Sequence, residues 1–341
     1  MIFFSSIQDK ESKGLDITPS GWLSRLKEPV IKKKVLIIAG PTAIGKTAMS
    51  FRLAEMLEGE IISADSMQVY RGMDIGTAKP SLADRERVPH HLIDICNIED
   101  PFNVAQFYKE SQQALSFIFR KGATPIVVGG TGFYVHAFIY GPPSGPPSVP
   151  HIREKIEKQL DELGPHVLYE KLKNFDPDYA SKITPLDRHK IVRGLEIISI
   201  TGLKVTEFAS SSPELTKKYD FRCWFLYRPL EELYKKIEER CDIMMQGGLL
   251  EEVQRLELLG LCKNSSAAQA IGYRQCLQFL HSSQTKSDFQ TCVTEFKKAS
   301  RHYARRQFTW FRKEPLFRWL NVSSISMEQA AEIIAHDFEA S

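Results

Sequence analysis

Residues 40–47 match the pattern G-x-x-x-x-G-K-[ST], which is typical of loops that bind phosphate groups. The loop follows an apolar run at 35–39 and precedes a helix-like run at 48–54. In that setting the backbone N–H groups of the loop converge on an anion, the helix N-terminus adds partial positive charge, and Lys46 adds a full one. The loop consists of Gly40, Pro41, Thr42, Ala43, Ile44, Gly45, Lys46 and Thr47. The sequence therefore predicts a site for a diphosphate or triphosphate.

A kinase or an ATPase is the first interpretation, because ATP-binding and other nucleotide-binding proteins share this loop. Such enzymes usually carry a second strand that ends in a magnesium-holding aspartate. Here the apolar strand at 126–128 ends in glycines, and Asp94 follows only a weak strand signal. The missing aspartate argues against ATP hydrolysis without excluding it.

Asp65 is the second candidate, because it follows another apolar run at 60–64. An aspartate there can cap a helix, or it can act as a general base toward a nucleophile that attacks beside the phosphate site. Both interpretations stay open from the residues alone. The glycine-punctuated loop at 72–80 is long enough to cover a site. The pair His90 and His91 lacks a third metal ligand at useful spacing, which favours a surface or capping role.

A basic stretch near the C-terminus is the third candidate. Between Lys297 and Lys313 there are seven Lys and Arg residues and no acid, interleaved with aromatic residues. A local basic stripe on a chain of net charge +3 favours a polyanionic ligand. Aromatic and guanidinium planes can stack on unpaired bases. The alternative is a solvated helix face whose aromatic residues lie in the core.

Short apolar strands alternate with helical segments in the first part of the chain, which predicts an α/β fold with a parallel sheet flanked by helices, similar to P-loop NTPases. The phosphate loop, Asp65 and Thr131 would then share the carboxyl edge of the sheet. Strands are predicted at 35–39, 60–64, 91–95, 125–128 and 221–226, and helices at 104–119, 151–163, 165–175, 187–201, 230–245, 249–259 and 296–311.

The run of prolines and glycines at 141–150 marks a boundary. We predict a loose extension at 1–32, a P-loop-like catalytic core at 33–143 plus 216–325, an all-helical insertion at 144–215, and a C-terminal tail at 326–341.

Composition narrows the class of protein. The 341 residues are 43% hydrophobic, without an apolar run near the ~20 residues of a membrane span, and the first twenty lack the features of a secretory signal. Six scattered cysteines form no C-x-x-C pair. A cytoplasmic protein without a disulfide framework or a structural zinc site is expected.

The combination of these segments resembles the tRNA dimethylallyltransferase family (tRNA isopentenyltransferases, or IPP transferases, of the bacterial type). The resemblance covers residues 35–320 and rests on the motifs at 40–47, 63–70, 72–80, 128–132, 271–275 and 305–312. It implies transfer of a dimethylallyl group from dimethylallyl diphosphate to the N6 amine of adenosine 37, in the anticodon loop of tRNAs that read codons beginning with U. It also implies that the loop holds the diphosphate of the prenyl donor rather than ATP.

The resemblance assigns roles by matching position. Thr42, Lys46, Thr47 and Arg240 would contact the diphosphate with Mg2+, for which Thr47 is the candidate ligand. Asp65 would meet the adenine N6 amine as the catalytic base, and Thr42 and Arg240 would be the other catalytic residues. Residues matching tRNA contacts are Asp65, Ser66, Met67, Gln68, Thr131, Arg153, His189, Lys190, Ile191, Val192, Arg193, Gln269, Ala270, Ile271, Gly272, Tyr273, Arg274, Arg305, Arg306, Gln307, Phe308, Thr309, Trp310, Phe311 and Arg312. His189 and Lys190 depart from the Gln-Arg of the family.

Expected partners are therefore dimethylallyl diphosphate and the anticodon arm of tRNA, with no membrane, and the enzyme is expected to be a monomer. The nearest alternative is an adenylate isopentenyltransferase, which acts on free AMP, ADP or ATP and needs no grip on tRNA. A P-loop small-molecule kinase and a non-catalytic RNA-binding protein are the others.

Overall fold

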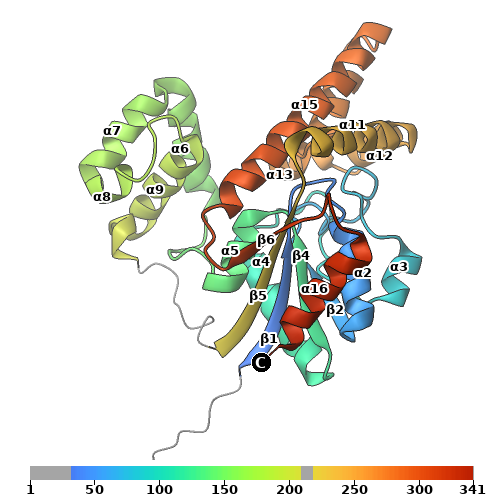
Figure 1. Ribbon diagram of the computed structural model, residues 1–341. Helices are drawn as coiled ribbons and strands as arrows, with labels where there is room; N and C mark the ends of the chain where they lie inside the picture. The colour runs from blue at the N-terminus through green and yellow to red at the C-terminus, as the bar shows by residue number, and fades with distance from the viewer. Residues whose placement is uncertain (1–31, 209–217, 341) are drawn as a thin grey trace, which may run out of the picture. The chain divides into compact units, whose positions relative to one another are not determined.

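The computed structural model describes residues 32–208 and 218–340. Its centre is a six-stranded sheet with the strand order β3-β2-β4-β1-β5-β6 (Figure 1). The strands are β1 (Lys33–Ala39), β2 (Gly59–Ser63), β3 (His90–His91), β4 (Thr124–Gly129), β5 (Tyr219–Tyr227) and β6 (Phe317–Asn321). β1 pairs with β4, β2 with both β3 and β4, and β5 with β6, all in parallel. The predicted α/β fold with a P-loop-like parallel sheet is confirmed.

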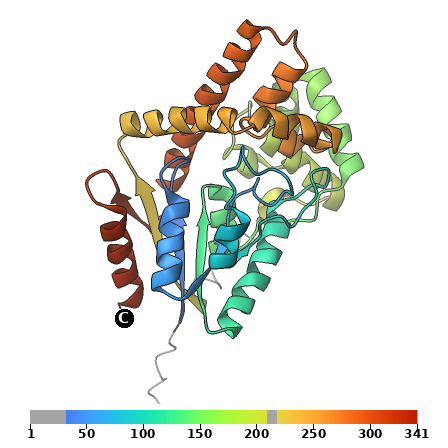
Figure 2. The same cartoon turned by 90° about the vertical axis from the view of Figure 1, so that its right-hand side faces the viewer.

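Helices cover both faces of the sheet (Figures 1 and 2). On one face α2 (Lys46–Met56) packs against α16 (Met327–Glu339), and on the other α4 (Val104–Arg120) packs against α5 (Gly132–Tyr140). The four residues 35–38 of β1 are completely buried. A continuous apolar strand of this kind is what a sheet covered on both faces requires.

The C-terminal residues differ from the predicted tail. Residues 327–339 form α16, and its buried face belongs to the main hydrophobic core. Ser326 caps the helix by accepting from the Gln329 N–H. At the other end Lys34 donates to the carbonyl oxygens of Phe338 (2.8 Å) and Ala340 (2.6 Å), which binds the helix C-terminus to β1.

The predicted strand at 91–95 is reduced to His90–His91. Leu92 and Asp94 adopt positive φ angles of 64° and 56°, which interrupt an extended chain. Asp94 forms ion pairs with Lys79 (2.6 Å) and Arg85 (2.7 Å). It therefore does not serve as a magnesium-holding aspartate beside the phosphate loop.

The remaining helices of the core gather at the carboxyl edge of the sheet, where α11 follows directly from β5 (Figure 2). These elements are α11 (Leu230–Gln246), α12 (Leu249–Leu258), η2 (Leu261–Lys263), α13 (Ser265–Ala268), α14 (Tyr273–Leu280) and α15 (Lys286–Phe311), whereas the short helix α3 (Leu82–Arg87) lies between β2 and β3 in the sequence. α15 begins at Lys286 rather than at 296, because Thr285 and Asp288 form a capping box there.

A separate set of helices lies between α5 and β5 in the sequence. It consists of α6 (Pro150–Leu163), α7 (Pro165–Phe175), α8 (Pro177–Ala180), α9 (Arg188–Thr201) and η1 (Val205–Glu207). These helices surround a hydrophobic cluster of their own. The helical character predicted for this stretch is present, whereas its status as an independent tRNA-binding domain stays a prediction. The predicted extension at 1–32 and the end of the insertion fall almost wholly outside the described residues. In the described ranges no helix is long and apolar enough to cross a membrane.

Candidate active site

The ends of three neighbouring strands bring the candidate residues together. The loop at 40–47 follows β1, Asp65 follows β2, and Thr131 follows β4. Because β2, β4 and β1 are adjacent, these residues meet at one edge of the sheet. Two adjoining cavities open there, and both are lined by Thr42, Asp65, Thr77, Arg240 and Tyr303.

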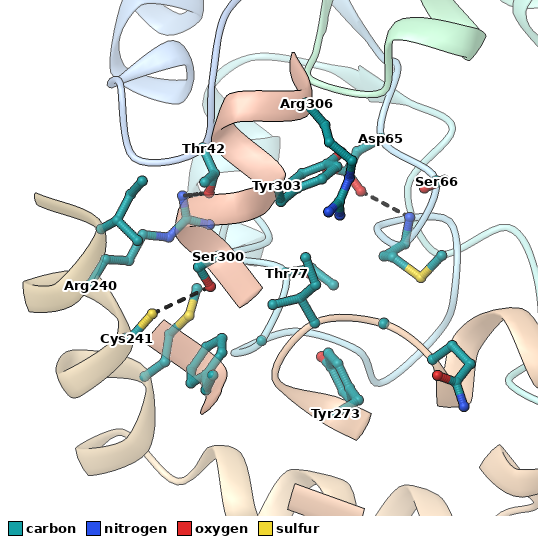
Figure 3. Close-up of a pocket in the computed structure, with 18 of the residues that line it drawn as sticks. Thr42, Asp65, Ser66, Thr77, Arg240, Cys241, Tyr273, Ser300, Tyr303 and Arg306 are labelled. Carbon is teal, nitrogen blue, oxygen red and sulfur yellow. Dashed lines mark hydrogen bonds between the residues drawn. The ribbon is translucent and has the colours of Figure 1, made fainter. Parts of the chain in front are cut away.

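The first cavity is polar and contains the phosphate loop. Its wall consists of residues 42–47 of the loop together with Gln68, Ala78, Gly130, Lys236, Glu239, Ile243 and Gln307 and the five shared residues. Lys46 Nζ donates to the carbonyl oxygens of Gly40 and Pro41, each at 2.9 Å. Arg240, from α11, points at the loop and donates to Thr42 Oγ1 at 3.2 Å (Figure 3).

Positive charge is concentrated around this cavity. Burial, reinforced by the Arg240 guanidinium, lowers the pKa of Lys46 to about 7, and Asp65 opposes the shift. Burial also lowers the pKa of Arg240, again opposed by Asp65. Two poorly solvated cations thus share one carboxylate. A bound anion would relieve this imbalance, since an opposite charge nearby favours the charged form of each.

Gln307 on α15 holds the phosphate loop in place. Its Oε1 accepts from the Thr42 N–H at 3.0 Å, and its Nε2 donates to the Gly130 carbonyl at 2.9 Å. Gln307 is only 4% exposed. A Cβ atom at position 130 would lie 2.2 Å from Nε2, so the contact requires glycine there. One side chain therefore links the loop after β1 to the loop after β4.

Asp65 has both of the features that the sequence suggested. Its Oδ1 accepts from the N–H groups of Met67 (2.9 Å) and Gln68 (3.3 Å), as a capping aspartate does. Its carboxylate also faces both cavities beside Tyr303 (Figure 3). Burial and the nearby Asp65 raise the pKa of Tyr303 to about 12, so this phenol stays protonated at neutral pH. A capped, fixed carboxylate at a cavity wall has the placement that proton transfer needs.

The second cavity is more apolar and encloses about 950 Å³, including the space at its open mouth. Its apolar lining comes from α11, α15 and the segment before α14, namely Ile237, Cys241, Met244, Phe296, Ala270 and Ile271. Cys241 Sγ donates to Ser300 Oγ at 3.6 Å (Figure 3). Burial raises the pKa of Cys241, which keeps this thiol protonated and unreactive. A cationic, phosphate-type site thus adjoins a site that suits a hydrocarbon.

Comparison with known proteins agrees with this geometry. The family model described as IPP transferase matches residues 68–314, and the model described as isopentenyl transferase matches residues 33–100. The chain belongs to the IPP transferase family. A tRNA dimethylallyltransferase of Protochlamydia amoebophila is 54% identical over 90% of each chain, and one of Chlamydia pneumoniae is 46% identical over 91% of each.

Solved structures of the IPP transferase family share the fold. A tRNA isopentenylpyrophosphate transferase of Bacillus halodurans aligns with a TM-score of 0.66 and 36% identity, over 90% of this chain and 97% of that one. A eukaryotic dimethylallyltransferase described as acting on tRNA aligns with a TM-score of 0.74 and 30% identity, over 90% of this chain and 79% of that one.

Many predicted site residues of this IPP transferase do lie together. Gln269 and Tyr273 join the loop, Asp65, Ser66, Met67 and Arg306 along the cavity walls. Thr131 accepts from the Ser66 N–H at 3.2 Å and so reaches the Asp65 turn. Arg274 lines a neighbouring basic groove with Arg306, Lys298 and His302.

Other residues of the predicted tRNA-binding stretches have buried side chains, and their role in tRNA binding stays a prediction. Ile191 and Val192 are 0% and 2% exposed in the cluster of the inserted helices. Phe308 and Phe311 are buried in the main core. Gly272 is also buried. These positions shape the surface without presenting a side chain to it, whereas His189 and Lys190 are exposed.

Arginines of the inserted helices are engaged within the protein. Arg193 donates to Glu196 at 2.8 Å and to the Pro146 carbonyl at 2.5 Å. Arg153 forms an ion pair with Glu157 at 2.9 Å. Their guanidinium groups would have to exchange partners to contact a phosphate. The role assigned to them in tRNA binding stays a prediction.

The basic stretch of α15 is partly neutralised by acids from α11. Lys297 pairs with Asp242 at 2.7 Å, and Arg301 pairs with Glu238. The exposed residues of the stretch include Arg305, Arg306, Thr309, Trp310 and Arg312. The interpretation as a solvated helix face with aromatic residues in the core therefore applies to part of the stretch, and contact of its exposed residues with tRNA stays a prediction.

The histidine pair has structural partners. His91 Nε2 lies 2.7 Å from Glu60 Oε2, and His90 Nδ1 lies 2.7 Å from the Val88 carbonyl oxygen. Among residues 32–208 and 218–340, no three His, Cys, Asp or Glu side chains cluster as a metal site would require. Sequence reasoning missed Thr77, Tyr303 and the clamping role of Gln307, because only tertiary contacts reveal them.

Proposed function

We propose that this chain is a tRNA dimethylallyltransferase that transfers a dimethylallyl group from dimethylallyl diphosphate to N6 of adenosine 37 in the anticodon loop of tRNAs that read codons beginning with U. The observation that carries the proposal is the junction of two cavities, one cationic and one apolar, with Asp65 at their shared wall.

The donor is proposed to bind with its diphosphate in the polar cavity. Amides of the loop, Lys46 and Arg240 would bind the phosphate oxygens, and Thr42 would contact them through its hydroxyl. The dimethylallyl group would then point into the apolar cavity between α11 and α15. Negative charge on the leaving diphosphate rises as the carbon–oxygen bond breaks. These hydrogen-bonding and cationic groups therefore stabilise the transition state more than they stabilise bound dimethylallyl diphosphate.

A magnesium ion is compatible with the residues present. The polar cavity offers the Thr47 hydroxyl, and Mg2+ commonly binds through one or two protein oxygens plus substrate phosphates. A cage made only of protein ligands is neither present in the described ranges nor needed. When bound, the ion would neutralise charge on the diphosphate.

The chemical step is an alkylation. The N6 atom of adenine forms a bond to C1 of the dimethylallyl group, and the bond from C1 to the diphosphate oxygen breaks, with its electron pair leaving on diphosphate. The N6 proton passes to Asp65, whose Oδ1 is already fixed by two backbone amides. General base catalysis of this kind contributes about 10²–10⁴-fold.

The acceptor is proposed to enter along the exposed face of α15. Adenosine must leave the anticodon loop to reach Asp65, at a cost of a few kcal/mol that is smallest for bases in loops. Arg306 is exposed, lines the apolar cavity and borders the basic groove of Arg274 and Lys298. It is therefore suited to contact both the extruded nucleotide and the backbone. We expect the enzyme to act as a monomer.

The test is incubation of the purified chain with labelled dimethylallyl diphosphate and total tRNA, followed by digestion to nucleosides. Label in N6-(dimethylallyl)adenosine from tRNA supports the proposal. Parallel reactions contain AMP in place of tRNA, or ATP without any prenyl donor. Label that enters AMP but not tRNA would establish an adenylate isopentenyltransferase, and saturable ATP turnover without donor would establish a kinase or ATPase.

A further inference from the structure

Residues 72–80, in the connection between β2 and α3, form a loop that makes one wall of the candidate site. Gly76 and Thr77 line the apolar cavity, and Thr77 also lines the polar one. The loop has no strand or helix of its own, so its position depends on contacts with the rest of the chain. Those contacts come from a distant part of the sequence.

Glu252, on α12, accepts hydrogen bonds from the backbone of this loop. Its Oε2 accepts from the N–H groups of Asp74 (3.1 Å) and Ile75 (2.8 Å), and its Oε1 accepts from the N–H of Gly76 (3.3 Å). Tyr273, on α14, donates its hydroxyl to Oε1 at 2.6 Å. One carboxylate thus accepts from three successive amides and one phenol. Glu252 is only 4% exposed.

The charge of Glu252 is balanced by dipoles rather than by a cation. No Lys, Arg or His of residues 32–208 and 218–340 forms an ion pair with it. Because a buried carboxylate without its donors is costly, Glu252 and the loop hold each other in one arrangement. Burial and Glu252 together raise the pKa of Tyr273 well above its ordinary value, so the phenol remains a donor.

The loop in turn contacts the segment that carries Asp65. The Thr77 carbonyl accepts from Gln68 Nε2 at 3.2 Å, and Gln68 Oε1 accepts from the Ser63 hydroxyl at 3.0 Å. The Gln68 N–H donates to Asp65 Oδ1 at 3.3 Å. A continuous set of hydrogen bonds therefore runs from Glu252 through the loop to Asp65.

Tyr273 also fixes the loop by contact. A Cβ atom at Gly76 would lie 2.4 Å from the Tyr273 ring, so the backbone of the loop rests directly on that ring. Figure 3 shows Tyr273 below Thr77, on the side of the cavity away from Arg306. The Tyr273 ring and the Glu252 carboxylate therefore both contact Gly76.

We infer that Glu252, with Tyr273, is a positioning residue for the reaction, which sets the cavity wall at 74–77 and, through Gln68, the orientation of Asp65. This inference rests on the proposed function. Glu252 touches no reacting atom, so its loss should lower the rate of the chemical step and leave tRNA affinity unchanged. A displacement of about 1 Å at a reacting group can cost ~100-fold in rate.

The main variant is Glu252→Gln. Glutamine has one acceptor oxygen in place of two, and its NH2 group faces N–H donors, so at least one loop amide loses its acceptor. We expect the single-turnover rate constant of prenyl transfer to fall about 10- to 100-fold. The tRNA dissociation constant should stay within about twofold. Hydrogen exchange of peptides covering 65–80 should accelerate.

Glu60→Gln is the matched control. Glu60 is a carboxylate of β2 that is 5% exposed and pairs with Lys121 and with His91, and it lines neither cavity. The Glu60→Gln protein should be less stable than the wild type, with an unchanged single-turnover rate constant of prenyl transfer. Tyr273→Phe is the second variant, which removes only the hydroxyl and keeps the inference testable should Glu252→Gln not fold. It should slow transfer less than Glu252→Gln and add nothing to the double variant.

Faster exchange confined to 65–80, with a slower rate constant and unchanged tRNA affinity, supports the positioning role. An unchanged rate constant in a folded Glu252→Gln or Tyr273→Phe protein overturns it. So does an equal loss of rate in Glu60→Gln, because the effect would then be general destabilisation. Absence of prenyl transfer in the wild-type chain is a different result, and it would reject the proposed function instead.

Discussion

Two replacements of Asp65 distinguish its role as a capping residue from its role as a general base. The Asp65 carboxylate accepts two backbone N–H groups through Oδ1 and faces both cavities. Asp65→Ala removes the acceptor and the base together. Asp65→Asn keeps a side-chain oxygen that can accept the same two amides, since asparagine caps as well as aspartate, but it cannot take a proton from N6. The pair of variants therefore distinguishes capping from catalysis.

The expected magnitudes differ enough to be resolved. Loss of a cap costs about 1 kcal/mol, which lowers the melting temperature of a protein of this size by roughly 2 °C. Loss of a general base costs about 10²–10⁴-fold in rate, or roughly 3–5 kcal/mol of transition-state stabilisation. Asp65→Ala should show both effects. Asp65→Asn should show the second effect with little of the first.

Single-turnover transfer of labelled dimethylallyl to tRNA gives the rate constant, thermal unfolding gives the stability, and filter binding gives the tRNA affinity. Both variants should bind tRNA. The reasoning fails if Asp65→Asn transfers within about tenfold of the wild type, because Asp65 would then be a capping residue only. It also fails if activity follows the melting temperature across the two variants.

Three further outcomes are expected. The KM for the prenyl donor should rise by up to roughly tenfold per pH unit above pH 7, because the diphosphate binds protonated Lys46, whose pKa in the free protein is about 7. Lys46→Arg stays charged, so its KM should not rise with pH in this way. A rise of KM with pH in Lys46→Arg would contradict the assignment. Arg306→Ala should weaken tRNA binding and reduce the salt slope by about 1, whereas Arg301→Ala, paired with Glu238, should leave the slope unchanged in filter binding. Gln307→Ala should raise donor KM while tRNA affinity is kept, and an unchanged KM would show that the bonds to Thr42 and Gly130 are not needed.

The parts of the site that could be predicted from sequence are those defined by local patterns. The loop at 40–47 carries its own spacing, and Asp65 follows a recognisable strand, so β1 and β2 place both at one edge. Helix α9 was predicted almost to its ends because Gly202, with φ at 69°, closes it.

Features that depend on distant contacts could not be predicted. Glu252 occupies an ordinary position of an amphipathic helix, and nothing near it in the sequence indicates three loop amides as partners. The sequence predicts a tail at 326–341, whereas the structure has the covering helix α16 there. The apolar face of Ala330, Ala331, Ile334, Ala335 and Phe338 becomes decisive only once α2 offers a surface for it. The neutralisation of Lys297 by Asp242 likewise joins two helices far apart in sequence.

The choice between a nucleotide and a prenyl donor lies outside the phosphate loop. The loop pattern specifies an anion and nothing of the group attached to it. That group would enter the adjoining cavity, whose apolar lining includes Ile237, Cys241, Met244 and Phe296 and whose polar lining includes Thr77, Gln269 and Ser300. Burial of a five-carbon prenyl group there is worth about 4 kcal/mol, at roughly 0.8 kcal/mol per carbon. A ribose hydroxyl placed against the apolar part of the lining would cost about 1–3 kcal/mol if left unpaired. We therefore expect α11 and α15, which carry Ile237, Cys241, Met244 and Phe296, to favour a hydrocarbon donor more than the phosphate loop does.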